Sequence, residues 1–412
     1  MIKKLGVLSL LLALLLPTLS SCGAPMGKET ITVWAAENVL TFTRERCQVF
    51  LEENPDVAEQ FQINVVAMSE GDTASQMQTD VDAGADVYAF AQDQLGRLIR
   101  AGALSPLGGT FLDAVKTENA PGSVAAASMG DRVYAYPLTA DNGYMLYYDT
   151  SVVTDPTSLR AILADCAAAG KKMYMDIRNG WYLVSFFFGA GCHYKTEVNA
   201  DGNIVSVDCD FNSEKGLKAL KAAIAAAKEA GFQQGTDFAS QFNPTGGKAA
   251  AAVSGPWDAA TIRAHLGENY GVAPLPRMDV MENGEPMSTW AGYKLMGVNP
   301  TQSEEGVKAS HRLAAYLTGE AIQLERYLYA GWGPSNLAAQ NSEAVRSDKA
   351  LSALREQMAI SPLQPQCSNN FWSKMGALGT DIDAGTYDQY SDTQLRSVLD
   401  ELTGYLKNDV AA

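Results

Sequence analysis

Histidine is scarce in this chain of 412 residues, which contains only His193, His265 and His311. No two of them stand at the spacing of zinc ligands, and no H-E-x-x-H motif is present, so the sequence argues against a zinc hydrolase. A weak echo of a calcium loop at Asp381–Asp392 has its glycine one position early and lacks the bidentate glutamate. We therefore predict neither a metal site nor a cofactor.

The motifs of nucleotide-dependent enzymes and serine hydrolases are also missing. Residues 247–249 read Gly-Lys-Ala, without the serine or threonine of a P-loop, and Phe242 stands where that motif has its first glycine. The stretch 189–191 lacks the third glycine of a dinucleotide fingerprint, and no G-x-S-x-G is present. Nothing in the sequence therefore points to nucleotide chemistry or to a serine nucleophile.

Basic residues are outnumbered, with 31 Lys+Arg against 47 Asp+Glu and a formal net charge of −16 at pH 7. Such an acidic surface repels phosphate backbones, and no local run of lysine and arginine offsets the repulsion. We expect no nucleic-acid partner.

Hydrophobic residues make up 47% of the chain, which is enough for a folded globular protein of two or three domains.

Long apolar runs are absent beyond the first residues of the chain. Lys3 and Lys4 precede the apolar stretch Leu5–Leu16, and a small-residue site ending in Cys22 follows. This layout is typical of a secretory signal peptide, and the apolar stretch is shorter than the about 20 residues that span a bilayer. The site resembles the lipobox of bacterial lipoproteins, which implies an acylated Cys22. A plain cleaved signal is the alternative.

The lipobox resemblance assigns residues 1–21 to a signal peptide and 22–30 to a lipid-anchored tether. It implies a location at the outer face of the bacterial cell membrane.

Five cysteines remain, of which Cys47 and Cys166 follow helical apolar spacing and are predicted to be buried. Cys192 and Cys209 bracket a predicted hairpin with its turn at 200–203, so whether they form a disulfide stays open.

Predicted strands and helices alternate along the chain. Strands are expected at 31–34, 61–66, 86–90 and 172–177, and helices at 44–53, 74–83, 157–169, 215–230, 305–318, 321–329, 342–359 and 391–407. Alternation of this kind predicts an α/β fold with mostly parallel sheets and right-handed crossovers. We find no tandem repeat and no long linker.

Five stretches, in order, carry a family resemblance. They are residues 86–93 (DVYAFAQD), 134–138 (YAYPL) with Asp141, 179–182 (NGWY), 247–257 (GKAAAAVSGPW) and 371–372 (FW). Together they resemble the maltose/maltodextrin-binding branch of the extracellular solute-binding proteins that serve ABC transporters, from about residue 31 to the C-terminus. The resemblance implies a two-lobed periplasmic-binding-protein-like fold that closes over a sugar.

The implied lobes are discontinuous in sequence. An N-terminal lobe would comprise residues 31–138 and 293–342, and a C-terminal lobe residues 139–292 and 343–412. About three hinge crossings are expected, near 138–143, 289–295 and 340–347. Each lobe would be a mostly parallel sheet flanked by helices.

Aromatic side chains are the expected sugar contacts, because a pyranose ring has apolar faces and a polar rim. The resemblance implies stacking platforms at Phe90, Trp181, Trp257 and Trp372, with Tyr182 beside them. Gly180 is expected to let the backbone turn, and the Gly-Pro at 255–256 to place Trp257 at a strand-to-helix junction. The three remaining tryptophans match no platform, and we interpret them as core or hinge residues: Trp34, Trp290 and Trp332.

Carboxylates are the expected partners of the sugar hydroxyls, since an ionised carboxylate accepts strong hydrogen bonds. The resemblance implies this role for Asp93 and Asp141. Glu37 and Glu70 are further candidates because they follow predicted strands, where open α/β sheets bind ligands. Asn179 stands where the family commonly has a carboxylate, so its contact would be through an amide. Gln94 replaces a common arginine, so no cationic clamp is expected there.

These features predict a non-enzymatic protein that captures an oligosaccharide, foremost a maltodextrin, and delivers it to the permease of an ABC transporter as a monomer. A glycoside hydrolase using Asp93 and Asp141 is the rival from another class, but the two carboxylates are expected at separate strand ends. The same fold binding another oligosaccharide, such as a β-linked or fructose-containing one, stays open because aromatic platforms do not encode the linkage.

The lipoprotein prediction is directly testable. Mass spectrometry of membrane-extracted protein should find a lipid-modified Cys22 at the mature N-terminus, because two acyl chains hold a protein stably to a bilayer. Cys22→Ala should release the protein into the medium. A substituted protein that stayed with the membrane would contradict the prediction.

Overall fold

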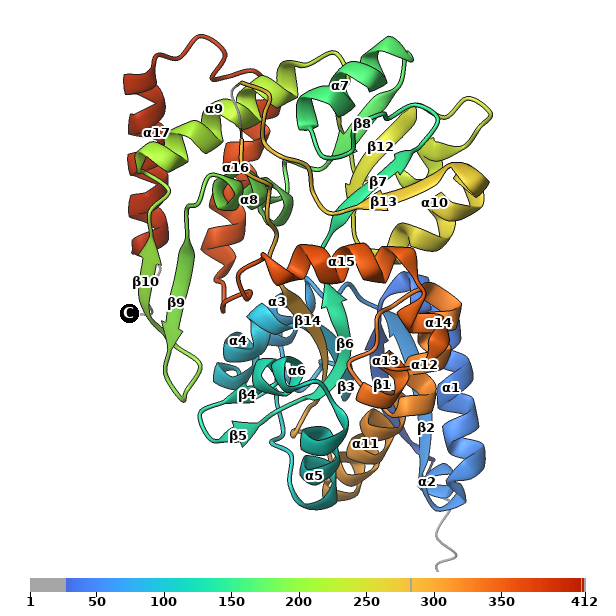
Figure 1. Cartoon of the computed structure of the whole chain (residues 1–412). Coiled ribbons are helices and arrows are strands. Elements are labelled where there is room, and N and C mark those ends of the chain that lie inside the picture. Colours follow the sequence, from blue (N-terminus) through green and yellow to red (C-terminus); the bar gives the residue numbers. More distant parts are fainter. Residues whose placement is uncertain (1–26, 282–283, 409, 411–412) are drawn as a thin grey trace, which may run out of the picture.

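The computed structural model describes residues 27–281, 284–408 and 410, so the signal-peptide and Cys22 predictions lie outside the described residues. Two five-stranded sheets lie one above the other (Figure 1). One has the order β2-β1-β3-β14-β6, and the other has the order β11-β8-β12-β7-β13. We call the sheet containing β1, with its helices, the N-lobe, and the sheet containing β8, with its helices, the C-lobe.

The N-lobe strands are β1 (Glu29–Ala35), β2 (Phe61–Ala67), β3 (Val87–Ala91), β6 (Tyr136–Asn142) and β14 (Gly292–Val298). The C-lobe strands are β7 (Met145–Asp149), β8 (Lys172–Met175), β11 (Phe232–Gln234), β12 (Ala249–Ser254) and β13 (Tyr270–Ala273). Within each sheet one strand, β14 or β7, runs antiparallel to its neighbours. The prediction of mostly parallel α/β sheets is therefore confirmed.

Helices flank both sheets, as expected for an α/β protein (Figure 1). In the N-lobe they are α1 (Leu40–Glu53), α2 (Pro55–Gln60), α3 (Thr73–Thr79), α4 (Leu95–Arg100), α5 (Gly109–Glu118), α6 (Pro121–Ala126), α11 (Glu304–Leu317), α12 (Glu320–Ala330) and α13 (Leu337–Gln340). In the C-lobe they are α7 (Leu159–Ala168), α8 (Gly180–Gly189), α9 (Glu214–Lys228), α10 (Ala259–Leu266), α15 (Lys349–Ala359), α16 (Asn369–Asp383) and α17 (Asp392–Lys407).

Most of the helices predicted from apolar periodicity are present within a few residues of their predicted bounds. In α9, Leu217, Leu220 and Ile224 are buried on one face, and Ser213 caps the start by accepting a hydrogen bond from the Gly216 N–H. The helix predicted at 342–359 is instead two helices, α14 (Glu343–Arg346) and α15, because Asp348 caps α15 through the Leu351 N–H. The helix predicted at 74–83 ends at Thr79.

Three chain passages connect the lobes. They run from β6 to β7, from β13 to β14, and from α13 through α14 to α15. Their positions fit the expected hinge of three crossings, and the domain bounds themselves stay a prediction. Within the described part of the chain, no helix combines the length and apolar character that crossing a bilayer requires.

The predicted hairpin is confirmed as β9 (Tyr194–Val198) and β10 (Ile204–Cys209), paired antiparallel. Cys192 and Cys209 are both free thiols in this structure, and so are Cys47 and Cys166. These four and Cys367 are buried, and burial raises the pKa of the Cys192 and Cys209 thiols to about 12. The predicted burial of Cys47 and Cys166 is confirmed.

Close packing of α8 on α16 fixes the upper wall of the space between the lobes. A Cβ atom on Gly379 would lie 1.8 Å from the Ile177 carbonyl oxygen, and one on Gly180 would lie 2.5 Å from the Met375 Cβ. Neither glycine has a positive φ. Gly180 is therefore required for close approach, which corrects the expectation that it serves to turn the backbone.

Gly379→Ala should lower the free energy of unfolding by about 1–3 kcal/mol, because the added methyl group of α16 meets the Ile177 backbone, which leads into α8 and has no room to move. Gly404→Ala in α17 is the matched control, since a Cβ there meets nothing within 4 Å. The control should stabilise the protein by ~0.5–1 kcal/mol through helix propensity. Urea unfolding measures both, and equal effects would contradict the packing argument.

Candidate functional site

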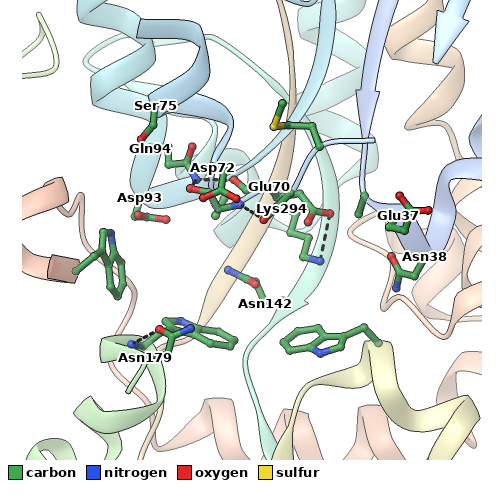
Figure 2. Close-up of a pocket in the computed structure, with 18 of the residues that line it drawn as sticks. Glu37, Asn38, Glu70, Asp72, Ser75, Asp93, Gln94, Asn142, Asn179 and Lys294 are labelled. Carbon is green, nitrogen blue, oxygen red and sulfur yellow. Dashed lines mark hydrogen bonds and ion pairs between the residues drawn. The ribbon is translucent and has the colours of Figure 1, made fainter. Parts of the chain in front are cut away.

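A cleft of about 1090 Å³ lies between the two lobes (Figure 2). On the N-lobe side it is lined by residues that follow the carboxyl ends of β1, β2 and β3. On the C-lobe side it is lined by the starts of α8 and α16 and by the 3-10 turn Pro256–Asp258 after β12. Both sheets thus turn their strand ends toward one space, which is where open α/β sheets bind ligands.

Carboxylates collect on the N-lobe side of the cleft. Glu37 follows β1, Glu70 and Asp72 follow β2, and Asp93 follows β3. Figure 2 shows these four side chains along one side, with Asn179 across from them. Parallel strands place their carboxyl ends at the same edge of a sheet, so four acidic residues far apart in sequence converge here.

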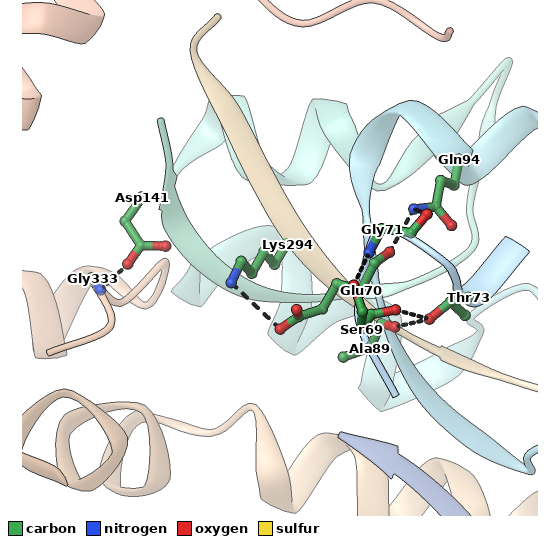
Figure 3. A network of polar contacts seen from close by, with 9 residues as sticks. All are labelled: Ser69, Glu70, Gly71, Thr73, Ala89, Gln94, Asp141, Lys294 and Gly333. Carbon is green, nitrogen blue, oxygen red and sulfur yellow. Dashed lines mark hydrogen bonds and ion pairs between the residues drawn. The ribbon is translucent and has the colours of Figure 1, made fainter. Parts of the chain in front are cut away.

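Gln94 holds the loop that carries two of these carboxylates. Its side-chain oxygen accepts a hydrogen bond from the Ala74 N–H at 2.7 Å, and its amide nitrogen donates to the carbonyl oxygens of Glu70 and Gly71 (Figure 3). The side chain is buried. Gln94 therefore positions the 69–74 loop.

Asp93 lies where the two lobes meet. The Trp372 indole, which comes from α16, donates a hydrogen bond to its carboxylate, and Arg97 lies nearby and donates to Asn369. Burial raises the pKa of Asp93 to about 6, and the positive charge of Arg97 opposes that rise. Asp93 is thus a desolvated acceptor already oriented by one donor from the opposite lobe.

Aromatic rings line the C-lobe side. They are Trp181 and Tyr182 at the start of α8, Trp257 after β12 and Trp372 in α16. The rings of Trp181 and Trp257 lie with centroids 5.9 Å apart and planes inclined by 33°. Tyr144 supports Trp181 edge-on, with centroids 4.7 Å apart, and donates a hydrogen bond to its carbonyl oxygen at 2.7 Å.

Local sequence explains how two of these features arise. Asn179 caps α8, because its side-chain oxygen accepts a hydrogen bond from the Trp181 N–H at 3.0 Å, and its amide nitrogen is left for a ligand. Gly255 makes room for the Trp257 ring, since a Cβ there would lie 2.1 Å from ring atoms. Pro256 begins the turn as predicted, at its first position.

Two sequence-predicted site residues lie elsewhere. Phe90 is fully buried in the N-lobe core beside Tyr88, so its assignment as a stacking platform is corrected. Asp141 is buried at the first hinge crossing, where its carboxylate accepts a hydrogen bond from the Gly333 N–H (Figure 3). Asp141 is therefore a hinge residue rather than a lining residue of the cleft.

Sequence reasoning missed Lys294, which lies in β14 and lines the cleft. Its Nζ is 3.4 Å from a Glu70 carboxylate oxygen, 3.9 Å from the Trp332 ring centroid and 5.3 Å from the Trp257 ring centroid. Trp332 itself lines the cleft, which corrects its interpretation as packing alone, whereas Trp290 is a core residue as predicted. The cleft has further polar lining residues that were not predicted: Asn142, Asp258, Gln364 and Asn369.

Two lobes that turn a carboxylate-rich wall and an aromatic wall toward one cleft define a ligand-binding protein of the two-lobed type. The family model described as "Bacterial extracellular solute-binding protein" matches residues 45–353, which is more than half of the chain. The protein belongs to this family. Because the family is extracellular, the protein is an exported one.

Named relatives cover nearly the whole chain. The "Galactooligosaccharide-binding protein" of Bacillus subtilis (strain 168) is 24% identical, with 94% of each chain covered. The "Maltodextrin-binding protein MdxE" of the same organism is 24% identical, with 92% of this chain and 91% of that protein covered. The structure titled "Maltodextrin binding protein MalE1 from L. casei BL23 without ligand" is 25% identical, covers 92% of this chain and 99% of its own, and has a TM-score of 0.73.

Asp93 should make folding stability depend on pH in a defined direction. Its pKa is raised from 3.8 to about 6, so between these values the folded protein keeps a proton that the unfolded chain has released. The contribution of this group to stability therefore falls as pH rises from about 4 to about 6. The Asp93→Asn variant lacks this loss, so its unfolding free energy relative to wild type should rise by up to about 3 kcal/mol over that window.

Urea unfolding of both proteins at a series of pH values between about 4 and 7 measures this difference. Asp72→Asn is the control, because it removes another cleft carboxylate that is more exposed. A difference between Asp93→Asn and wild type that stayed constant with pH would contradict a buried, proton-holding Asp93.

Proposed function

We propose that the protein binds an oligosaccharide in the cleft and delivers it to the permease of an ABC transporter without altering it chemically. The proposal rests on one observation, which is that an aromatic wall and a carboxylate wall lie on opposite sides of the cleft. Trp181, Trp257 and Trp372 offer flat apolar faces, and Glu37, Glu70 and Asp93 offer acceptors across the same space. A sugar ring needs both, because its faces are apolar and its rim carries hydroxyl donors.

Maltodextrins are the sugar class that we propose first, because the stretches of sequence resembling the maltose/maltodextrin-binding branch supply the aromatic wall. A maltodextrin-binding protein is also among the relatives. A second candidate is a galactooligosaccharide, which the name of another relative supports. The three tryptophan rings suit either class of sugar, because stacking depends on the faces of the sugar rings and not on the linkages between them.

The placement of most carboxylates on one wall supports binding without catalysis. A glycoside hydrolase needs two carboxyl groups on either side of one bond. Here Glu37, Glu70, Asp72 and Asp93 stand on one wall, and Asp258 on the other accepts a hydrogen bond from its neighbour Ser254 at 2.6 Å. The named relatives are binding proteins as well.

Closure of the lobes supplies the signal for delivery. Most of the carboxylates belong to the N-lobe and most of the rings to the C-lobe, so a ligand contacts both sets fully only when the lobes approach each other. Ligand therefore shifts the population toward the closed form, which the permease recognises. We further propose that a lipid on Cys22 tethers a monomeric protein to the membrane, which keeps it near the permease.

Isothermal titration calorimetry tests the proposal with maltose, maltotriose, maltotetraose, a galactooligosaccharide and cellotriose. We expect at least one series to bind, and Trp181→Ala to weaken its binding by ~1–3 kcal/mol through loss of a stacking face. Tyr329→Ala is the control, because that ring is 51% exposed and lies outside the cleft. Failure of the whole panel to bind, or equal effects of both variants, would overturn the proposal.

A further inference from the structure

The starts of two helices from different lobes meet beside the cleft. α4 of the N-lobe follows a 3-10 turn that contains Asp93, and α16 of the C-lobe extends toward it (Figure 1). Asp93 and Arg97 stand four residues apart on the N-lobe side. Asn369 and Trp372 stand three residues apart at the start of α16. Each spacing places both residues on one face of a helical turn, so two polar faces meet where the lobes touch.

The two faces exchange hydrogen bonds. The Trp372 indole donates to the Asp93 carboxylate. In the opposite direction, Arg97 Nη1 donates to the side-chain oxygen of Asn369. Three of these four residues line the cleft, whereas Arg97 lies behind them and is 6% exposed. Arg97 therefore touches the wall of the cleft from its protein side.

Burying Arg97 costs free energy that its hydrogen bonds do not fully offset. Its Nε has no hydrogen-bond partner among the described residues, and its bond through Nη1 is to a neutral amide. Removing a guanidinium from water is costly unless an opposite charge compensates it. The compensating charge is that of Asp93, which is 4% exposed and is also costly to bury. Each of the two charges thus depends on the other.

Two further titratable groups act on Arg97. Arg100 lies further along α4, is exposed, and donates to the Gly202 carbonyl oxygen at 3.1 Å. The Cys367 thiol comes from the segment before α16. Burial raises the pKa of Asp93, and the charge of Arg97 opposes that rise. Without this guanidinium, Asp93 keeps its proton up to a higher pH.

Both partners of Arg97 are groups that a ligand in the cleft can contact. An ionised carboxylate accepts stronger hydrogen bonds from hydroxyl groups than a protonated one, so a nearby positive charge favours the accepting form of Asp93. The bond to the Asn369 oxygen fixes which end of the amide is occupied. The two donors of its amide nitrogen are thereby left for a ligand.

We propose that Arg97 is a positioning residue for sugar binding, which acts through Asp93 and Asn369 without touching the sugar. Its charge keeps Asp93 ionised, and its hydrogen bond holds Asn369 in one orientation. The presence of Gln94 predicts no cationic clamp here, and Arg97 instead supplies a positive charge from behind the wall. The proposal rests on the proposed function and deepens it, because it identifies what sets the protonation state of a ligand-contacting carboxylate.

Two variants separate the charge of Arg97 from its hydrogen bond. Arg97→Met removes both and keeps an unbranched side chain, whereas Arg97→Lys keeps the charge and loses the planar fork. Arg100→Met is the matched control, since it removes one arginine from the exposed side of the same helix. Thermal unfolding verifies that each variant is folded.

A carbon NMR titration of the aspartate carboxyl groups, without sugar, measures the pKa of Asp93, and Asp93→Asn identifies its signal. We expect this pKa to rise by about one pH unit or more in Arg97→Met, because the opposing positive charge is gone. In Arg97→Lys the rise should be less than half as large. Arg100→Met should change the pKa by less than about 0.3, because exposed charges are screened.

Calorimetry with maltotriose and with a galactooligosaccharide of three units supplies the second readout, at pH 6 and pH 9. For a sugar that binds, the ratio of wild-type affinity to Arg97→Met affinity should be about five-fold greater at pH 6 than at pH 9. The reason is that a pKa raised by one unit leaves much less ionised Asp93 at pH 6, whereas both proteins are ionised at pH 9. For Arg97→Lys and Arg100→Met the ratio should be nearly the same at both pH values.

The outcomes separate this proposal from the one on which it rests. An unchanged pKa of Asp93 in Arg97→Met overturns the role of Arg97 whether or not a sugar binds. If the pKa rises but the affinity ratio for a bound sugar is equal at both pH values, the role of Arg97 is also wrong and the sugar-binding function stands. If wild type binds no sugar at either pH, both proposals fail.

Discussion

The cleft depends on the ion pair between the Lys294 ammonium group and the Glu70 carboxylate. Among the described residues that line the cleft, Lys294 is the only cation, and the same lining contains five carboxylates in a chain of net charge −16. It lies 3.4 Å from Glu70 and is one of the charges that lower the pKa of Asp141, which burial otherwise raises. Removing one partner of such a buried pair is strongly destabilising, because the other charge is left without compensation.

Lys294 also joins elements of the two lobes. It extends from β14, a strand that follows one hinge passage, and its Nζ lies over the Trp332 ring of the N-lobe and near the Trp257 ring of the C-lobe. Gly333, the residue after Trp332, donates a hydrogen bond to Asp141, which lies beside the passage from β6 to β7. The same charge balance therefore bears on the hinge and on the binding wall, which links ligand recognition to the closure that we propose.

The sequence supported much of the fold and the aromatic wall, and the reasons for its failures are specific. Trp181, Trp257, Trp372 and Asp93 all line the cleft. Turns after strands place Trp181, Trp257 and Asp93 there, and the start of α16 places Trp372. Phe90 lies in a strand whose residues 87–90 are all buried, and such a strand shows no alternation that separates core from cleft.

Lys294 could not be predicted because its position depends on long-range pairing. β14 inserts between β3 and β6 from about 200 residues further along the chain, and no local pattern announces that insertion. The split between α14 and α15 was missed for a local reason. The apolar residues of 342–359 follow one helical pattern, and that pattern does not show that Asp348 caps the start of a second helix. Pairing partners and caps, rather than composition, set the limit of sequence reasoning here.

The central claim is that a sugar draws the carboxylate wall and the aromatic wall together. Small-angle X-ray scattering of the mature protein, free and saturated with a sugar that calorimetry shows to bind, tests this most directly. The account predicts a smaller radius of gyration in the saturated sample, and tryptophan fluorescence that changes over the same range of sugar concentration. Identical scattering from the free and saturated samples would contradict closure and would leave a rigid carbohydrate-binding module in its place.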